Sequence, residues 1–346
     1  MNNQLITIIY EKLEKFNDPI SNKPLNKNNN NVNIVTKDSH AHISITINPK
    51  DEDKYGVLSS NLNDALKDIK GLLSVNVIFT AEKNSIAENS EKRRFQINAK
   101  NIIAIASGKG GVGKSTFAVN LSVALTKIGC KVGILDADIY GPSIPRMMNI
   151  SEKPKTNENQ KLIPIEKYGI KCMSIGFLIG EDTPTIWRGP MIMKALEQMF
   201  NGVEWGELDY LIIDLPPGTG DAQITLAQSS KLSGSIIVST PQDIALIDAR
   251  KAINMFKRVD VPVLGVVENM SYFICSNCNE RHEIFSHGGA RKESEKFKTN
   301  FLGELPINKN LRIHSDEGQP MCISEPESDI AKIYIKIAEN LNSTNN

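Results

Sequence analysis

The chain has 346 residues and a mass of 38.3 kDa, which is enough for two or three ordinary domains. Hydrophobic residues make up 40% and charged residues 23%, so the composition excludes both a multi-span membrane protein and a wholly disordered chain. Forty basic side chains balance forty acidic ones. This neutrality leaves no whole-chain field that would attract nucleic acid or anionic lipid.

The cysteine content and the N-terminus both indicate a cytoplasmic protein. Five cysteines are an odd number and sparse for this length, which favours a reducing compartment over a disulfide framework. Charged residues at 11, 12, 14 and 15 interrupt the apolar pattern that a signal peptide needs. The longest apolar run, 102–106, is far shorter than the ~20 residues of a membrane span.

Residues 1–83 are predicted to form a small α+β domain. Asp18-Pro19 ends the first helical pattern, and an Asn-rich stretch at 26–31 is typical of a solvated loop. The periodicity predicts these elements in chain order: a helix at 5–16, strands at 32–35 and 41–47, a helix at 58–69 and a strand at 73–79.

A polar and charged segment, 84–100, has no sustained apolar period and is predicted to be a linker. Beyond it, from 101 to 342, short buried-strand runs alternate with helical patterns. The runs are 102–106, 132–135, 210–213, 236–239 and 263–267. Such alternation predicts an α/β fold, with a mostly parallel sheet and helices on both of its faces.

A phosphate-binding loop directly follows the first of these strands and opens a helical pattern. Its glycines allow backbone N–H groups to wrap phosphate oxygens, Lys114 supplies a cation, and Ser115 is placed to ligate Mg²⁺. The strand, the eight-residue spacing and the helix together indicate a P-loop. The residues concerned are Gly108, Lys109, Gly110, Gly111, Val112, Gly113, Lys114, Ser115 and Thr116.

Carboxylates follow two later strands, where open α/β sheets bind ligands. Asp136 and Asp138 come after the run 132–135, and Asp214 comes after 210–213. We expect Asp214 to hold Mg²⁺ through water and Asp138 to orient the attacking water. The Pro- and Gly-rich segment 216–221 is a stiff loop suited to sensing the γ-phosphate.

Cys275 and Cys278 have the spacing with which two thiolates grip one soft metal. His282 is close enough to be a third ligand, but the remaining cysteines are single and scattered. A two-fold dimer would complete the site, with one pair from each subunit around a shared Zn²⁺ or iron-sulfur cluster. A lone redox dithiol and an inert pair of loop cysteines remain the alternatives.

The chain from 100 to 340 resembles the deviant P-loop ATPases, and within them the Mrp/ApbC family of iron-sulfur cluster carriers. Lys109 marks the class, and four segments mark the family: 136–143 (DADIYGPS), 187–190 (WRGP), 214–221 (DLPPGTGD) and 268–271 (ENMS). The resemblance implies that Lys109 acts in trans on a partner's nucleotide while Lys114 acts in cis. It also implies that Asn269 contacts the adenine, that the loop near Pro306 lines the base pocket, and that Cys275 and Cys278 bind the cluster.

The N-terminal domain resembles the MIP18-like iron-sulfur assembly domain. Asp18-Pro19 fits that pattern, but the segment 47–52 lacks the cysteine that such domains often carry before the second helix. A docking role is therefore expected in preference to cluster handling.

We therefore predict an ATP-hydrolysing carrier with ATP, Mg²⁺ and an iron-sulfur cluster, a 4Fe-4S cluster bridging a homodimer. Its expected partners are apo iron-sulfur proteins and cluster-assembly factors, with no nucleic acid and no membrane. Two alternatives stay open: a MinD/ParA-like positioning ATPase, and a zinc-bridged scaffold with weak ATPase activity, because thiolates suit zinc and iron-sulfur alike. The apolar stripe of the last helix, from Ile330 to Leu341, is expected to pack into the core and not onto a membrane.

Overall fold

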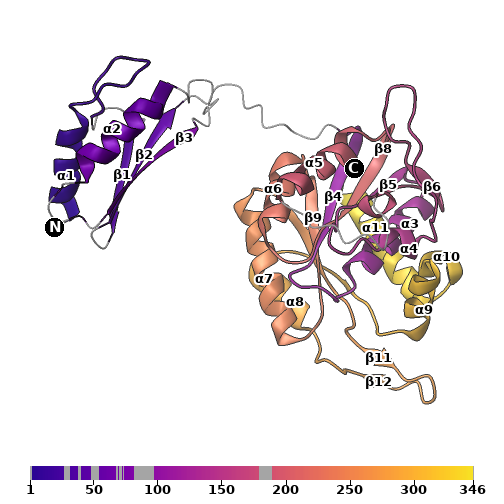
Figure 1. Ribbon diagram of the computed structural model, residues 1–346. Helices are drawn as coiled ribbons and strands as arrows, with labels where there is room; N and C mark the ends of the chain where they lie inside the picture. Colours follow the sequence, from indigo (N-terminus) through magenta and orange to yellow (C-terminus); the bar gives the residue numbers. More distant parts are fainter. Residues whose placement is uncertain are drawn as a thin grey trace. The chain divides into compact units, whose positions relative to one another are not determined.

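The computed structural model divides into two compact units, Met1–Glu91 and Lys92–Asn346 (Figure 1). It describes residues 2–26, 32–37, 40–47, 54–67, 69, 72, 74–81, 97–178 and 189–345. Most of the predicted linker, most of the Asn-rich stretch, the segment 48–53 and Trp187-Arg188 lie outside these residues.

The first unit is a three-stranded sheet with two helices. Its elements are α1 (Asn2–Leu13), β1 (Val32–Lys37), β2 (His40–Ile47), α2 (Gly56–Leu66) and β3 (Ser74–Ala81). The strand order is β1-β2-β3, with β1 antiparallel and β3 parallel to β2. Alternate residues of β2 are buried and share one core with residues of both helices, namely Ile9, Leu13, Leu62 and Leu66.

Helix α1 ends three residues earlier than the predicted 5–16, and the reason is the turn that follows it. The Asp18 carboxylate accepts hydrogen bonds from the backbone N–H of Ile20 and Ser21 and from the Tyr55 hydroxyl, the last at 2.7 Å. These donors lower the pKa of Asp18 against the effect of its burial. Asp18 therefore fixes the turn that was predicted at Asp18-Pro19.

The second unit contains an eight-stranded sheet in which only β6 runs antiparallel to its neighbour. The strand order is β13-β10-β9-β4-β8-β5-β7-β6. The strands are β4 (Ala99–Ala106), β5 (Val132–Asp136), β6 (Ile165–Lys167), β7 (Ile170–Ser174), β8 (Leu208–Asp214), β9 (Gly234–Ser239), β10 (Val263–Glu268) and β13 (Phe301–Glu304). The predicted α/β fold is confirmed, although β4 begins within the predicted linker.

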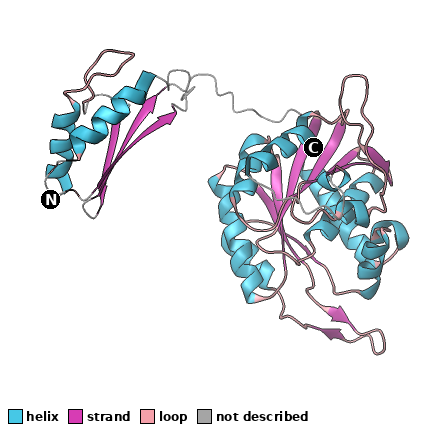
Figure 2. Ribbon diagram, in the orientation of Figure 1, coloured by secondary structure: helices cyan, strands magenta, loops and turns pink. Residues whose placement is uncertain are grey.

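Helices cover both faces of this sheet (Figures 1 and 2). One group packs around α3 (Lys114–Lys127) and α11 (Asp329–Asn345), and the other around α7 (Asp243–Arg258). The first group also contains α4 (Ile144–Met147), α9 (Lys309–Glu317) and α10 (Met321–Ser324), and the second α5 (Gly189–Asn201), α6 (Asp221–Ser229) and α8 (Gly289–Phe297). A short 3-10 helix, Ile175–Phe177, follows β7.

The last helix packs into the core, as its apolar stripe predicted. Ile330, Tyr334, Ile337 and Leu341 are buried, and the Tyr334 ring lies 5.7 Å from the ring of Phe117 on α3, centroid to centroid. None of the helices that the structure describes combines the length and apolar character that a bilayer crossing requires.

Candidate nucleotide and metal sites

The predicted P-loop connects the end of β4 to α3, which begins at Lys114. Gly111 and Gly113 have φ values of +79° and +83°, a conformation that favours glycine. The loop borders a cavity of ≈ 210 Å³. Ser107, Gly110, Gly111, Gly113, Lys114, Ser115, Thr116, Asp138, Met147 and Pro217 line it.

Asn269 supports the P-loop from β10. Its Nδ2 donates a hydrogen bond to the carbonyl oxygen of Val112 at 2.9 Å, and a Cβ on Gly113 would lie only 2.2 Å from the same nitrogen. The absence of a side chain at Gly113 therefore allows this contact. The contact between Asn269 and adenine stays a prediction, and the loop support is a role that the sequence did not suggest.

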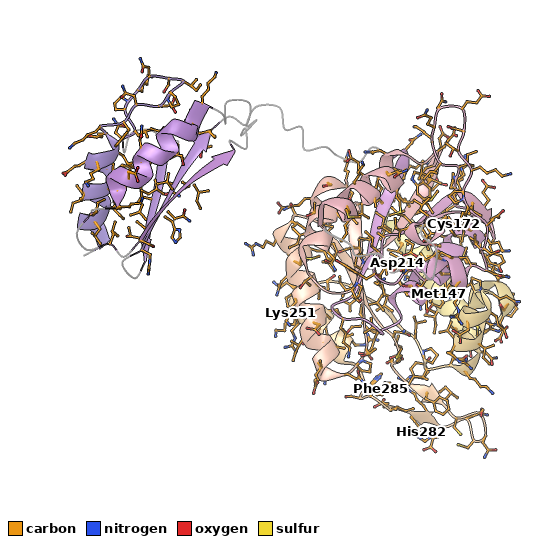
Figure 3. All side chains as sticks on the ribbon, viewed as in Figure 1. Met147, Cys172, Asp214, Lys251, His282 and Phe285 are labelled. Atoms are coloured by element: carbon orange, nitrogen blue, oxygen red, sulfur yellow. The ribbon has the colours of Figure 1, made fainter. Side chains whose placement is uncertain are left out.

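Lys114 is buried between two carboxylates at the carboxyl edge of the sheet, where Figure 3 labels Asp214. Its Nζ lies 2.7 Å from Asp214 Oδ1 and 3.4 Å from Asp138 Oδ2, and its side chain is only 6% exposed. The structure thus brings together three residues that the sequence assigned to the site. A phosphate group that bound here would replace these carboxylates as the partner of Lys114.

Two buried carboxylate oxygens face this site without a partner. Among the described residues, no hydrogen-bond donor reaches Asp138 Oδ1 or Asp214 Oδ2. Burying an unpaired carboxylate oxygen is costly, whereas such oxygens are the ligands that a hydrated Mg²⁺ prefers. The residues therefore fit Mg²⁺, and its binding by Ser115 and, through water, by Asp214 stays a prediction.

Asp136 has a different environment from Asp138. It is fully buried and accepts hydrogen bonds from the N–H groups of Asp138 and Ile144, both at 3.2 Å, and from Ser174 Oγ at 3.0 Å. Burial and the neighbouring Asp214 raise the pKa of Asp136 to about 7. Asp136 therefore positions the loop that carries Asp138. Ser174 escaped the sequence analysis because β7 lacks a continuous apolar run.

Lys109 points to the beginning of α7. Its Nζ lies 3.4 Å from Gln242 Oε1, and Gln242 is the residue just before the helix. On the same helix Ile244 is 69% exposed and Ile247 is 47% exposed, which is unusual for isoleucine. An unpaired apolar surface therefore lies on the helix that begins beside Lys109.

Cys275 and Cys278 lie in the turn of a small hairpin between β11 (Phe273–Ile274) and β12 (Arg281–His282). Backbone N–H groups of Cys278 and Asn277, and the Cys278 thiol, lower the pKa of the Cys275 thiol. Burial instead raises the pKa of Cys172 and of Cys322 to about 12. The hairpin pair is thus suited to bind metal as thiolate, whereas the two buried cysteines are not.

Four residues, which we call the Glu268–Arg281 network, connect the base of this hairpin to the end of β10. Arg281 Nη1 lies 3.1 Å from Glu304 Oε1, and Ser271 Oγ lies 3.3 Å from Glu304 Oε2. The Ser271 hydroxyl donates to Glu268 Oε1 at 2.6 Å. The network is Glu268, Ser271, Glu304 and Arg281. Because Asn269 follows Glu268, the network meets the residue that supports the P-loop.

The fold and the site define the class of protein. A parallel sheet with a glycine-rich loop between β4 and α3, a buried lysine and convergent aspartates is a P-loop NTPase. A family model described as ParA, NUBPL iron-transfer P-loop NTPase, matches residues 98–342. The chain belongs to this family.

Two curated relatives and one solved structure illustrate what the chain is similar to. An iron-sulfur protein required for NADH dehydrogenase from Arabidopsis thaliana is 56% identical, over 70% of this chain and 78% of that protein. The iron-sulfur cluster carrier protein of Helicobacter pylori is 41% identical over 99% of this chain and 91% of its own length. A nucleotide-binding protein from Archaeoglobus fulgidus, solved with ADP, is 43% identical with a TM-score of 0.60, covering 68% of this chain and 93% of that one.

Proposed function

We propose that this chain is an ATP-hydrolysing carrier that holds a labile iron-sulfur cluster between two copies of itself and passes it to apo-proteins. The observation that carries the proposal is the pair Cys275 and Cys278, exposed in part or in full at a hairpin turn, where backbone N–H groups lower the pKa of the Cys275 thiol. Relatives that are named as cluster carriers support it.

Two thiolates per chain require a second chain. A 4Fe-4S cluster takes four cysteine ligands, and a two-fold axis brings identical hairpins together. The exposed Ile244 and Ile247, on the helix that begins beside Lys109, support a second area of contact between the copies. In the same dimer Lys109 acts in trans, as the cation that one copy delivers to the other's phosphates.

In each copy, different residues of the nucleotide site bind the phosphates, orient the attacking water and hold Mg²⁺. The P-loop N–H groups and Lys114 bind the phosphates, after Lys114 leaves Asp214 and Asp138. Asp138, relieved of that ion pair, accepts a hydrogen bond from the attacking water. Bound Mg²⁺ neutralises phosphate charge, and Ser115 and Asp214 would hold it.

Nucleotide state reaches the cysteines through the Glu268–Arg281 network. Asn269 contacts the P-loop at Val112 O, and the neighbouring Glu268 begins the polar contacts that end at Arg281 in the hairpin. Rearrangement of the P-loop on ATP binding or hydrolysis therefore changes the support of the hairpin. We propose that this change in the hairpin weakens the binding of the cluster in one nucleotide state.

Anaerobic reconstitution with iron and sulfide tests the proposal. The wild type should gain visible absorption and bound iron and sulfide, whereas a Cys275→Ala, Cys278→Ala double variant should lose them. Cys130→Ala is the matched control, because Cys130 lies outside the hairpin and is only partly exposed. Uptake by the double variant equal to that of the control would contradict the proposal. One Zn²⁺ shared by two chains in purified wild type would favour the zinc-bridged scaffold.

A further inference from the structure

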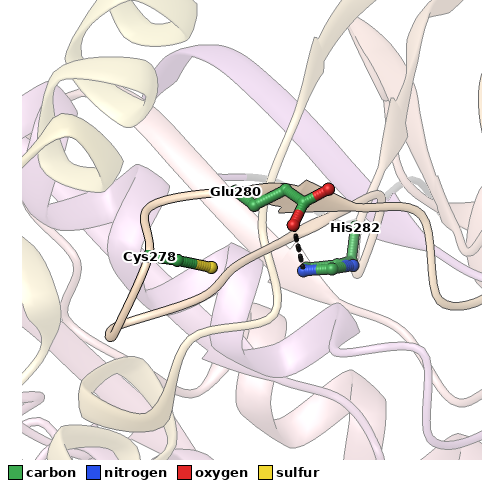
Figure 4. Close-up of side chains that lie close together, drawn as sticks. All are labelled: Cys278, Glu280 and His282. Atoms are coloured by element: carbon green, nitrogen blue, oxygen red, sulfur yellow. Dashed lines mark ion pairs between the residues drawn. The ribbon is translucent and has the colours of Figure 1, made fainter.

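The cysteine hairpin carries two more metal-binding side chains on the same chain (Figure 4). One donor atom from each of Cys278, Glu280 and His282 lies within 4.8 Å of the others, and His282 Nε2 is 3.8 Å from Glu280 Oε2. In a tetrahedral zinc site, ligand atoms about 2.0–2.3 Å from the metal are about 3.3–3.8 Å apart. Small side-chain rotations therefore suffice to close these donors around an ion.

The strand geometry explains why these side chains gather. Glu280 and His282 are two residues apart along β12 and its lead-in, so they share one face of the hairpin. Arg281, between them, points to Glu304 instead. The backbone N–H of Cys275 donates to the carbonyl of Glu280 at 2.9 Å, which holds the turn over this face. Cys275 lies three residues before Cys278 in the same turn and supplies a further thiol there.

We infer that a single copy of the chain binds one divalent transition-metal ion, Zn²⁺ in preference to Fe²⁺, through four donors of one hairpin: Cys275, Cys278, Glu280 and His282. Two sulfurs, one imidazole and one carboxylate are a ligand set that suits zinc, and zinc binds such sites more tightly than ferrous iron. The inference rests on the proposed function only in using the same two thiolates.

The two uses of the thiolates exclude each other. A thiolate pair closed on an ion within one chain cannot at the same time bridge two chains, so the metal-loaded form lacks the cluster that two copies would share. Glu280 and His282 are exposed by 70% and 48%, and among the described residues their side chains contact only one another, 3.8 Å apart, so the fold does not depend on them. Variants at these positions therefore test the site without unfolding the protein.

Titration of the reduced, metal-free full chain with Co²⁺, a spectroscopic stand-in for Zn²⁺, tests the inference. We expect one Co²⁺ per chain, with thiolate charge-transfer bands and the visible bands of a tetrahedral ion. His282→Ala and Glu280→Gln should each weaken Co²⁺ binding by at least ~10-fold. His42→Ala, in the first unit, and Glu283→Gln, in the loop after β12, should bind as the wild type does.

Wild-type affinity in both ligand variants, or half an ion per chain in a dimer, would overturn the inference. Iron and sulfide uptake by the same proteins separates it from the proposed function. If Co²⁺ binding ignores His282 and Glu280 while cluster uptake still requires the cysteines, only the inference fails. If Co²⁺ binding depends on His282 while the wild type takes up no cluster, the inference holds and the proposed function fails.

Discussion

Single residues of the nucleotide site show how a buried P-loop lysine is neutralised by two carboxylates. Lys114 is neutralised by Asp214 and Asp138, and one oxygen of each carboxylate has no partner among the described residues. Leaving a buried charge without its full set of partners costs free energy. The site therefore favours a ligand that brings both phosphate for Lys114 and a cation for the carboxylates.

Replacement of Lys114 and replacement of Lys109, the two lysines of the P-loop, should affect nucleotide binding and turnover differently. Lys114→Ala should abolish nucleotide binding, because it removes the cation that is buried in the site. Lys109→Ala should leave binding within a few-fold of the wild type and lower turnover by about 10³-fold or more, as loss of a cation delivered in trans does. Calorimetric ATP binding and phosphate release measure the two effects separately; equal losses of both in the Lys109 variant would count against action in trans.

Asp136 should make stability depend on pH. Its folded-state pKa of about 7 lies above the ordinary 3.8, so the folded protein holds a proton that the unfolded chain releases. This contribution to stability is fully present below pH ~4 and is lost as pH rises through about 7, with a slope of up to about 1.4 kcal/mol per pH unit.

Denaturant unfolding of the nucleotide-free protein at several pH values checks this expectation. Asp136→Asn should flatten the decline in the free energy of unfolding between pH ~4 and ~7, because the amide does not titrate. Asp260→Asn, at an exposed turn, should keep the wild-type slope. A variant at Asp136 whose slope matches that of the wild type would contradict the assignment.

Among the elements, burial decides which strands the sequence can predict. The five strands predicted for the second unit, β10, β9, β4, β8 and β5, are neighbours at the centre of its sheet, where helices on both faces require continuous apolar runs. The outer strands β13 and β6 are only partly buried, so their sequences lack such runs. The hairpin strands span two residues each, too short for any period to register.

The P-loop was predictable because its residues are contiguous and its neighbours, a strand and a helix, have strong patterns of their own. The residues that position the site could not be predicted from the sequence. Ser174, Gln242 and Glu304 come from three separate elements, and only the fold brings them to Asp136, Lys109 and Arg281. No local spacing in the sequence records such contacts.

Arg281 should transmit nucleotide state to the hairpin. Arg281→Ala removes the contact with Glu304 and leaves both cysteines in place, so cluster uptake should persist. The effect of ATP on the rate of cluster transfer to an apo-protein should fall at least ~5-fold, the lower range of measured couplings between sites. Arg312→Ala, which removes an exposed pair with Asp316, is the control. An unchanged ATP effect in the Arg281 variant would exclude the network as the route.

The whole molecule combines a P-loop NTPase unit with an additional N-terminal domain. The A. fulgidus relative is covered over 93% of its length by only 68% of this chain, whereas the H. pylori relative matches nearly all of it. The N-terminal unit therefore lies within the match to the H. pylori relative and outside the part of the chain, 98–342, that the family model matches. Its MIP18-like origin, its docking role and the cytoplasmic location of the protein stay predictions.

The central claim is that two copies of the chain share one cluster. The most direct test measures mass by light scattering, together with iron and sulfide content, on a single anaerobic preparation of the reconstituted protein. We expect a particle of twice 38.3 kDa with one 4Fe-4S cluster per two chains, and reversion to single chains when the cluster is removed. A particle of 38.3 kDa that carries the full complement of iron and sulfide would contradict it.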